Sequence, residues 1–468
     1  MRPIGVVGAG TMGAGIAALA VEASLRTLLY DPDARALERA PDGTEPVGDL
    51  GMLAECGLVI EAAPEDLELK RELFARLAEV VQPECVLATN TSSLSVTALA
   101  AGLPQPERVV GMHFFNPPAR MRLVEVVAGA DSGRHALAVA REAGEAMGKH
   151  VIEAADGPGF LVNRCNRPFA LEAMRIVQEG IATPEQVDRI CRMAGGFRMG
   201  PFELMDLVGL DVGLAVSRSF FEQSFGEPRW RPSTLAARLV AAGRLGRKSG
   251  RGWYVYPAGR PADPEPPEPG GASGLVRIGG EGRAADALRA WAAGAGLDVE
   301  PDDEPGVAVG GHRILACDRA PLAALDPGGE AAGFNLVPPF GRLVELTTQP
   351  TTAPAAVDAA EELFAALGMR AELVGDAPGL VLGRIVAQLV NEACFAVGDG
   401  IGSAADIDTG MVLGLNHPRG PLAWGEELGP EAVLGVLAGL QDEYREERYR
   451  PAPALVRAVR TGMPLGDG

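Results

Sequence analysis

The 468-residue sequence lacks a surplus of positive charge. Its 42 Lys and Arg residues face 62 Asp and Glu residues, which gives a formal net charge of −20. Nucleic acids and anionic membranes are bound by basic surfaces, so we expect neither kind of partner. The sequence also lacks an uncharged apolar run long enough to cross a bilayer, and its first residues lead directly into an apolar strand. We therefore expect a cytoplasmic protein.

Cysteine is scarce, and the six cysteines are scattered along the chain. No two of them have the spacing of a zinc site, a disulfide framework or a redox motif. The sequence therefore predicts reduced, buried thiols and no metal site.

Lysine is the rarer cation, since only Lys70, Lys149 and Lys248 occur and the other basic residues are arginines. An ammonium group is a compact point charge, whereas a guanidinium group is a broad fork, so a position close to a phosphate or a nicotinamide can require lysine. Each of the three lysines is either a candidate ligand-binding residue or an accident of composition.

The first part of the chain alternates short apolar strands with amphipathic helices. This pattern predicts a mostly parallel, doubly wound α/β sheet of the Rossmann type over residues 1–155. Strands are expected at 4–7, 25–30, 58–60, 86–88, 109–115 and 123–127. Helical periodicity then dominates, which predicts a separate all-α domain over residues 156–256. Prolines alternate with acids and glycines over residues 257–273, which indicates a stiff, solvated linker.

The second half repeats the first at an offset of 220. Arg122-Leu123-Val124-Glu125 recurs at 342–345, and Gly200-Pro201 recurs as Gly420-Pro421. The Asp-Gly-Pro-Gly sequence at 156–159 recurs as Asp-Ala-Pro-Gly at 376–379. A shared offset over such a length indicates that the helical domain is duplicated at residues 376–468. Residues 274–375 leave space only for a truncated, degenerate α/β fragment, with elements at 275–280, 284–293 and 307–316.

A glycine-rich sequence, Gly8-Ala9-Gly10-Thr11-Met12-Gly13, links the first strand to a helix. Glycines allow the backbone to approach a pyrophosphate at the start of the helix, and Asp31, which ends the next strand, can accept a hydrogen bond from a ribose 2′-hydroxyl. An acid at this place repels a 2′-phosphate, so the sequence favours NAD over NADP. The alternative is a tight turn without a ligand.

His113 and Glu125 lie on either side of a Pro117-Pro118 turn. If the chain folds back at this turn, antiparallel pairing centred on Ala119 places the two side chains opposite each other. A carboxylate beside an imidazole fixes its tautomer and stabilises the charge that forms when the imidazole takes a hydroxyl proton. This pair is suited to alcohol oxidation beside a nicotinamide. The alternative is a structural histidine in a buried turn.

These motifs together resemble the 3-hydroxyacyl-CoA dehydrogenase family, in the long bacterial form with a duplicated C-terminal domain. The resemblance covers nearly the whole chain and implies substrates such as 3-hydroxyadipyl-CoA or 3-hydroxybutyryl-CoA in phenylacetate or fatty acid breakdown. It is carried by the glycine-rich sequence and by Asn-Thr-Ser-Ser-Leu at 90–94, His-Phe-Phe-Asn-Pro at 113–117, Leu-Val-Glu-Val at 123–126, Gly-Pro-Gly-Phe-Leu-Val-Asn-Arg at 157–164 and Met-Gly-Pro-Phe-Glu-Leu at 199–204.

The resemblance also implies a role for each matching residue. His113 would be the general base with Glu125 as its partner, and Ser92 and Asn163 would hydrogen-bond the substrate near its hydroxyl and its thioester carbonyl. The residues on the cofactor side would be Glu65, Lys70, Asn90, Asn116 and Lys248. For each of these the alternative is a surface charge or a turn cap.

Two departures from the family pattern are visible. Family members carry a helical arm after the second strand that contacts coenzyme A, and here only about two dozen residues, broken by prolines and glycines, are available. In the repeat, His113 corresponds at offset 220 to Gly333 and Asn163 to Gly383, although Glu345 persists. A degenerate Gly280-Glu281-Gly282 turn places an acid where a phosphate would lie. The second copy is therefore expected to be inactive.

The sequence thus predicts one active site, which oxidises an (S)-3-hydroxyacyl-CoA with NAD. Because the helical arm is missing, a thioester on a carrier protein or a short pantetheine is an alternative substrate. A dinucleotide-binding protein without catalysis and a related enzyme that oxidises a free sugar acid are the competing functions. The duplicated domain suggests either a monomer with an internal pseudo-dimer or a homodimer.

Overall fold

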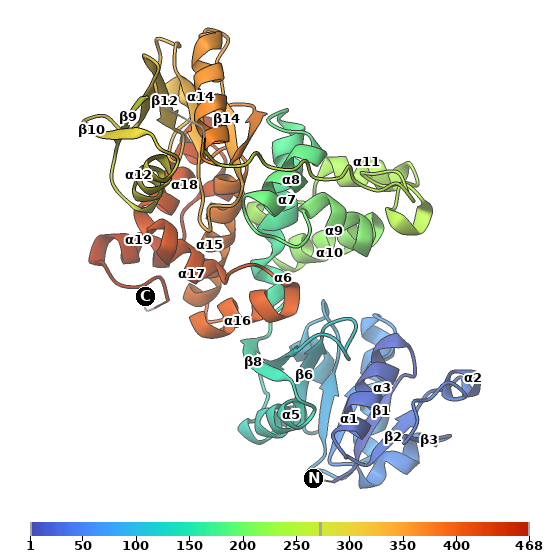
Figure 1. Cartoon of the computed structure of the whole chain (residues 1–468). Helices are drawn as coiled ribbons and strands as arrows, with labels where there is room; N and C mark the ends of the chain where they lie inside the picture. The colour runs from blue at the N-terminus through green and yellow to red at the C-terminus, as the bar shows by residue number, and fades with distance from the viewer. Residues whose placement is uncertain (1, 271–273, 467–468) are drawn as a thin grey trace. The chain divides into compact units, whose positions relative to one another are not determined.

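The computed structural model describes residues 2–270 and 274–466 (Figure 1). The chain divides into two compact units. The first extends to Arg164 and also includes Asp399–Asn416, and the second comprises Cys165–Gly398 and the residues from His417 onward. Residue 1 of the expected first domain, residues 271–273 of the expected linker and residues 467–468 of the expected last domain lie outside the described residues.

The first unit contains an eight-stranded sheet with the strand order β3-β2-β1-β4-β5-β6-β7-β8. All neighbouring strands run parallel except β6 and β7, which are antiparallel. The predicted doubly wound α/β domain is confirmed, with β3 and β8 as additional strands. The strands are β1 (Ile4–Val7), β2 (Thr27–Tyr30), β3 (Glu45–Val47), β4 (Leu58–Glu61), β5 (Val86–Thr89), β6 (Val109–Phe114), β7 (Leu123–Ala128) and β8 (His150–Ala155).

Helices cover both faces of this sheet. Buried residues of α1 and α5 form one cluster with the strand residues that point to their face. On the opposite face, Gly111 of β6 leaves space for Val96 of α4, and a Cβ at this glycine would lie 3.2 Å from Val96 Cγ2. The helices are α1 (Thr11–Glu22), α2 (Ala34–Leu37), α3 (Leu67–Val80), α4 (Val96–Ala100), α5 (Arg134–Ala146), α6 (Val162–Cys165) and α16 (Ala404–Leu415), with short 3-10 helices at Leu50–Glu55 and Pro106–Arg108.

The connection between β2 and β4 is short, as expected. It holds only the one-turn helix α2, the edge strand β3 and one 3-10 helix, so it forms no long helical arm.

The second unit contains two similar helical arrays. Helices α9 and α17 both begin at a proline, Pro201 and Pro421, which are 220 residues apart as predicted. Helix α7 of the first array packs against α15 of the second. The helices are α7 (Arg167–Gln178), α8 (Pro184–Met193), α9 (Pro201–Val208), α10 (Leu210–Gln223), α11 (Thr234–Ala241), α15 (Leu382–Gly398), α17 (Pro421–Leu428), α18 (Pro430–Tyr444) and α19 (Pro453–Thr461), with 3-10 helices at Pro228–Trp230, Arg247–Ser249 and Glu447–Tyr449.

The second unit also contains a seven-stranded sheet with the order β10-β9-β11-β12-β13-β14-β15. The elements expected at 275–280 and 284–293 are β9 and α12, and the stretch expected at 307–316 forms an antiparallel hairpin of two strands around Gly310 and Gly311. Helices α12 and α14 share a buried cluster with the sheet. The elements are β9 (Leu275–Gly279), α12 (Arg283–Gly294), β10 (Asp298–Asp302), β11 (Gly306–Val309), β12 (His312–Ala316), α13 (Leu322–Leu325), β13 (Ala332–Asn335), β14 (Leu343–Thr347), α14 (Pro354–Ala366) and β15 (Arg370–Val374).

The proline-rich linker forms no helix or strand between residues 257 and 270, but it is less solvated than expected. Arg192 holds Asp263 at 2.5 Å, and Arg260 lies 3.1 Å from Glu203. The Arg260 and Asp263 side chains are only about a quarter exposed. Ion pairs therefore fix the linker along the helical part of the second unit.

All six cysteines are free and buried, as predicted. Among the described residues, no helix is both long and apolar enough to cross a membrane.

Candidate active site

The glycine-rich loop between β1 and α1 has space for a pyrophosphate. Gly8 has φ +103°, and a Cβ there would lie 2.6 Å from the Ala62 carbonyl oxygen. A Cβ at Gly13 would lie 1.8 Å from the Gly8 oxygen, whereas Gly10 faces open space. No side chain caps the start of α1 at Gly10. Backbone N–H groups at an uncapped helix start bind phosphate oxygens, so the residues present fit the dinucleotide. The helix begins with Thr11 and Met12, as the sequence predicts.

Asp31 lies directly after β2 and beside this loop. Its Oδ2 accepts a 2.7 Å hydrogen bond from the Ala9 N–H, and its Oδ1 accepts one from the Asp33 N–H. Both bonds fix the carboxylate at the carboxyl end of the sheet, where a ribose bound next to the pyrophosphate would lie.

A buried ion pair lies under the end of β4. The Lys70 ammonium donates to Glu61 Oε1 at 2.6 Å and to the Ala63 carbonyl oxygen at 3.2 Å. Lys70 and Glu61 are almost completely buried, and Glu61 also accepts from Thr89 and from the Ala63 N–H. Lys70 thus fixes the backbone that follows β4.

Glu65 organises the turn that follows β5. Its Oε1 accepts hydrogen bonds from the Thr91 and Ser93 hydroxyls and from the Ser92 N–H. Burial opposes ionisation of this carboxyl, but the hydrogen bond from Thr91 and the charge of Lys70 outweigh it and lower the pKa of Glu65. The turn that carries Ser92 is therefore held by a charged residue.

Asn90 connects this turn to the neighbouring strand. Its side-chain oxygen accepts a 2.9 Å hydrogen bond from the Phe114 N–H, next to His113 in β6. Of the residues predicted to serve the cofactor, Asn90 is the one directly bonded to the strand that carries His113.

The His113–Glu125 pairing predicted from the turn is confirmed. The two residues are register partners in β6 and β7, and His113 Nδ1 lies 2.6 Å from Glu125 Oε2. Glu125 is fully buried and His113 is 6% exposed. The His113 ring lies 4.5 Å from the Phe115 ring, centroid to centroid. Because the carboxylate accepts from Nδ1–H, the Nε2 lone pair remains to take a proton.

The other oxygen of Glu125 is held by the loop that carries Asn163. Oε1 accepts from the Leu161 N–H at 3.2 Å and from the Val162 N–H at 2.9 Å. The loop bends sharply at Phe160, which has φ +52°. Asn163 lies in the one-turn helix α6 that follows, within the first unit.

The turn between β6 and β7 is held by Lys149. Its ammonium donates to the carbonyl oxygens of Pro118 and Met121, at 2.7 and 2.9 Å. Burial lowers the pKa of Lys149. Asn116 lies exposed at the start of this turn, and its peptide bond to Pro117 is cis.

Lys248 lies in the second unit. Its ammonium pairs with Asp211 Oδ1 at 2.6 Å, and both side chains are largely exposed. The hydrogen bond from Lys248 lowers the pKa of Asp211. All the other predicted site residues lie in the first unit.

Several residues that position this site were not predicted from the sequence. Glu61 and Thr91 carry the hydrogen bonds described above, and Lys149 was noticed only for its rarity. The backbone N–H groups of Leu161 and Val162 give no side-chain signal. The Gly-Pro-Gly sequence at 157–159 is the one indication that the backbone turns sharply there.

Comparison with known proteins identifies the family. The profile of the 3-hydroxyacyl-CoA dehydrogenase NAD-binding domain matches residues 3–47 and 44–157. The profile of the C-terminal domain of the same family matches twice, at 159–256 and at 379–466. The chain belongs to the 3-hydroxyacyl-CoA dehydrogenase family.

Two relatives in this family match nearly the whole chain. The chain is 38% identical to the 3-hydroxyadipyl-CoA dehydrogenase of Escherichia coli (strain K12), over 97% of each sequence. The crystal structure of 3-hydroxybutyryl-CoA dehydrogenase from Escherichia coli K12 has a TM-score of 0.88 and 37% identity, and covers 98% of this chain and 99% of that one. A 3-hydroxybutyryl-CoA dehydrogenase of Mycobacterium tuberculosis (strain H37Rv) is 40% identical but covers only 55% of this chain, with 99% of its own length. This dehydrogenase is therefore an NAD-dependent oxidoreductase of the long form.

The second sheet of this dehydrogenase corrects one predicted correspondence. Glu345 is the register partner of Asn335, and Gly333 pairs with Thr347 instead. Asn335, not Gly333, thus occupies the place of His113, because the turn before Glu345 is two residues shorter than the turn before Glu125. Pro339 follows a cis peptide bond as Pro117 does, and is likewise 222 residues away.

The second copy retains the carboxyl group without the base. Glu345 Oε1 accepts from the Leu382 N–H at 2.8 Å, as Glu125 does from Val162. Burial raises the pKa of Glu345 to about 8, against the opposing effect of backbone hydrogen bonds from Leu382 and Val381. Asn335 donates to the Gly379 oxygen, and a Cβ on Gly383 would lie 2.6 Å from its Nδ2. Because an amide stands in place of the imidazole, this copy lacks the general base.

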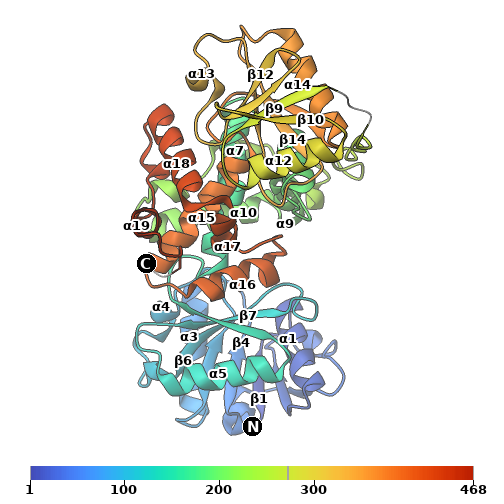
Figure 2. The same ribbon diagram turned by 60° about the vertical axis from the view of Figure 1, so that its left-hand side comes forward.

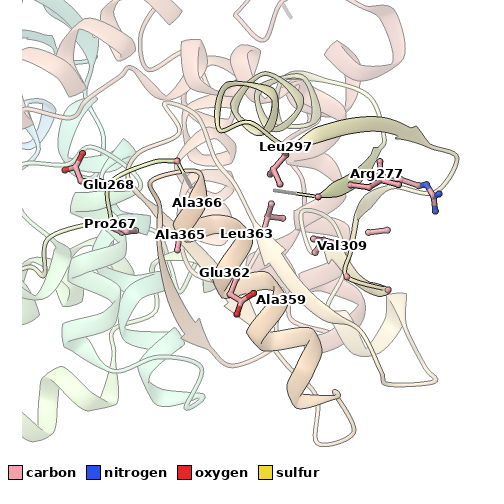
Figure 3. Close-up of a pocket in the computed structure, with 16 residues that line it drawn as sticks. Pro267, Glu268, Arg277, Leu297, Val309, Ala359, Glu362, Leu363, Ala365 and Ala366 are labelled. Atoms are coloured by element: carbon pink, nitrogen blue, oxygen red, sulfur yellow. The ribbon is translucent and has the colours of Figure 1, made fainter. Parts of the chain in front are cut away.

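The dehydrogenase also has a hollow of about 1000 Å³ between β9, the β11–β12 turn and α14 (Figure 3). Leu297, Val309 and Leu363 line it together with Arg277 and Glu362. The described residues around it include no histidine, serine or cysteine. It therefore carries none of the groups that the reaction needs.

Proposed function

We propose that the first unit carries the single active site of the chain and that it oxidises the 3-hydroxyl group of an (S)-3-hydroxyacyl-CoA. The observation that carries this proposal is the 2.6 Å contact between His113 Nδ1 and Glu125 Oε2 at the carboxyl end of a sheet with an open glycine-rich loop. An imidazole held in this way has one nitrogen free to accept a proton.

The side chains perform the proton transfer and position the substrate. His113 Nε2 removes the hydroxyl proton while the C3 hydride leaves and the C–O bond becomes a carbonyl. The buried Glu125 carboxylate stabilises the imidazolium that forms. Ser92 and Asn163 hydrogen-bond the substrate near its hydroxyl and its thioester carbonyl. When bound, NAD supplies the acceptor for the hydride.

The cofactor is held by the residues around the glycine-rich loop. Gly8, Gly10 and Gly13 leave room for the pyrophosphate, and Asp31 accepts from the ribose. Glu65, Lys70 and Asn90 position the turn around the nicotinamide side, and we retain Asn116 and Lys248 as cofactor contacts.

The substrate is a 3-hydroxyacyl thioester, and 3-hydroxyadipyl-CoA and 3-hydroxybutyryl-CoA are the two leading candidates. Their support is the names of the long and short relatives. The short connection between β2 and β4 favours a second candidate, a short pantetheine or carrier-protein thioester, because the arm that grips coenzyme A is missing.

The decisive experiment follows NADH absorbance with acetoacetyl-CoA in the reducing direction. We expect turnover with acetoacetyl-CoA, and a kcat/KM for acetoacetyl-pantetheine within about tenfold of it. A large preference for the full coenzyme would remove the pantetheine proposal. Binding of NADH without turnover of any 3-oxoacyl thioester would favour the non-catalytic alternative.

The assembly is proposed from the duplication. We infer that the two helical arrays form a pseudo-dimer inside one chain, because α7 and α15 pack against each other. The buried Arg384 of α15 binds Glu172 of α7 at 2.6 Å. Sedimentation of the full chain at a monomer mass would support this, and a dimer mass would favour the homodimer.

A further inference from the structure

One segment of the inactive copy lies in the first unit. Residues Asp399–Asn416, which we call the crossing segment, contain α16 and belong to the second C-terminal-domain match. Helix α16 packs against β7 and β8 in the sheet of the first unit (Figures 1 and 2). It thus lies beside the strand that carries Glu125.

A hydrogen bond and an ion pair join the crossing segment to the two ends of the loop that holds Glu125. Before the loop, the Ala155 N–H donates to the Ile401 oxygen at 2.7 Å. After the loop, Arg164 pairs with Asp399 at 2.5 Å. Between them, a Cβ on Gly402 would lie 2.8 Å from Leu161 Cδ2.

Two glycines of α16 allow its backbone to approach the site closely. A Cβ on Gly410 would lie 2.7 Å from Val162 Cγ2. A Cβ on Gly414 would lie 3.3 Å from Phe115 Cζ and 2.8 Å from Leu123 Cδ2. Phe115 in turn lies against the His113 ring. The helix therefore contacts neighbours of both members of the His113–Glu125 pair.

Equivalent contacts occur around the second sheet, where the helix comes from the first array instead of the second. There α8, from the first helical array, packs against β14 and β15. The Gly375 N–H donates to the Ile181 oxygen at 2.7 Å, and Arg384 pairs with Glu179. Each of these residues is 220 positions from its counterpart at the first sheet. The two copies have therefore exchanged α8 and α16. Removing the inactive copy would expose the face of the first sheet that α16 covers.

We propose that the crossing segment is a positioning element of the active site. Gly410 determines how closely Val162 can approach α16, and Gly414 determines the same for Phe115. This explains why an inactive copy is built into the chain: its helix holds the loop whose N–H groups orient Glu125. The proposal rests on the proposed function, because it concerns the same site.

The first test enlarges Gly414. We expect Gly414→Val to lower kcat by about 10- to 100-fold, because a displacement of catalytic groups by about 1 Å can lower the rate by about 100-fold. KM for NADH should change less than threefold. Gly398→Val is the matched control, since Gly398 is also helical and a Cβ there meets nothing within 4 Å. Its kcat should equal that of the wild type.

A second substitution that restores kcat distinguishes a positioning effect from a general loss of structure. Phe115→Leu in the Gly414→Val background makes room at the ring, so it should recover much of kcat. Equal kcat for Gly414→Val and the wild type would overturn the proposal, as would a loss of kcat that tracks the melting temperature and is not rescued. An inactive wild type would instead contradict the proposed function.

A second test uses the exchanged ion pairs and does not enlarge any residue. Asp399→Asn weakens the pair beside the Glu125 loop, and Glu179→Gln weakens the equivalent pair beside the second sheet. We expect Asp399→Asn to lower kcat at least fivefold, and Glu179→Gln to leave it unchanged. Equal effects of the two variants on kcat would contradict the proposal.

Discussion

Asn335 lies directly opposite Glu345, in the place in the second sheet that His113 holds opposite Glu125 in the first. Both carboxyl groups accept a backbone N–H from the loop that follows the sheet, at Leu382 and at Val162. The two copies therefore differ in the partner of the carboxyl group, not in how the carboxyl group is held.

Replacing His113 tests which copy is active. We expect His113→Ala to lower kcat by about 10²–10⁴-fold, the usual contribution of a general base. Adding Asn335→His to this variant should restore nothing, because Glu281 lies in the degenerate glycine turn and Gly383 stands where Asn163 would be. Stopped-flow NADH absorbance measures both variants. Recovery of turnover in the double variant would show that the second copy retains a cofactor site.

Glu345 predicts a pH-dependent stability. Its pKa of about 8 in the folded chain lies above the ordinary value of 4.5, so the folded state holds a proton that the unfolded state releases. The free energy of unfolding therefore falls as the pH rises between these two values, by at most about 1.4 kcal/mol per unit. Glu345→Gln carries no such proton and should gain stability relative to the wild type from pH 5.5 to pH 8. Urea midpoints across this range measure the difference, and a constant difference would exclude the effect.

The His113–Glu125 pair could be predicted from the sequence because the residues that determine it are close together in the chain. His113, the Pro117-Pro118 turn and Glu125 lie within 13 residues, so the pairing follows from a single turn. The correspondence of His113 with Gly333 failed for the opposite reason. The offset between the two copies is 220 after the turn but 222 before it. A deletion of two residues within the turn does not change the sequence pattern of either strand.

The exchange of α8 and α16 could not be predicted from the sequence. Both helices begin with an ordinary side-chain cap, Thr183 and Ser403, but a repeat pattern says nothing about which sheet a helix covers. Burial of Lys70 was equally hidden, since its partner Glu61 looked like the end of an ordinary strand. Contacts between residues far apart in the chain decide both features.

Because the Lys70–Glu61 pair is buried, we expect the single variant to lose more stability than the double variant. Lys70→Met leaves the Glu61 carboxylate buried without its cation, which costs about 3–5 kcal/mol. Glu61→Gln with Lys70→Met removes both charges and should recover most of that loss. KM for NAD should rise in the single variant, because Lys70 also holds the Ala63 carbonyl. Denaturant unfolding and initial rates measure both effects, and additive losses in the double variant would contradict the pairing.

Lys149 predicts that a residue remote from the chemistry affects kcat. Lys149→Met keeps the aliphatic part but removes the two hydrogen bonds to Pro118 and Met121, so stability should fall by about 1–3 kcal/mol. The β6–β7 turn loosens, and kcat should fall with it. Arg141→Met is the control, because it removes an exposed ion pair and costs less than about 1 kcal/mol. A similar kcat in the two variants would show that the turn does not influence the site.

We expect Asp31 to determine the choice of cofactor through its charge. Its carboxylate is fixed by the Ala9 N–H beside the loop, so it can accept from a ribose 2′-hydroxyl and repels a 2′-phosphate. Asp31→Ser removes the repulsion and weakens the hydrogen bond, so kcat/KM for NAD should fall about 10- to 100-fold while that for NADP rises. Asp33→Ser makes the same change of charge two residues later, at the exposed start of α2. If both variants shift the NAD to NADP ratio equally, long-range charge and not contact with the ribose sets the preference.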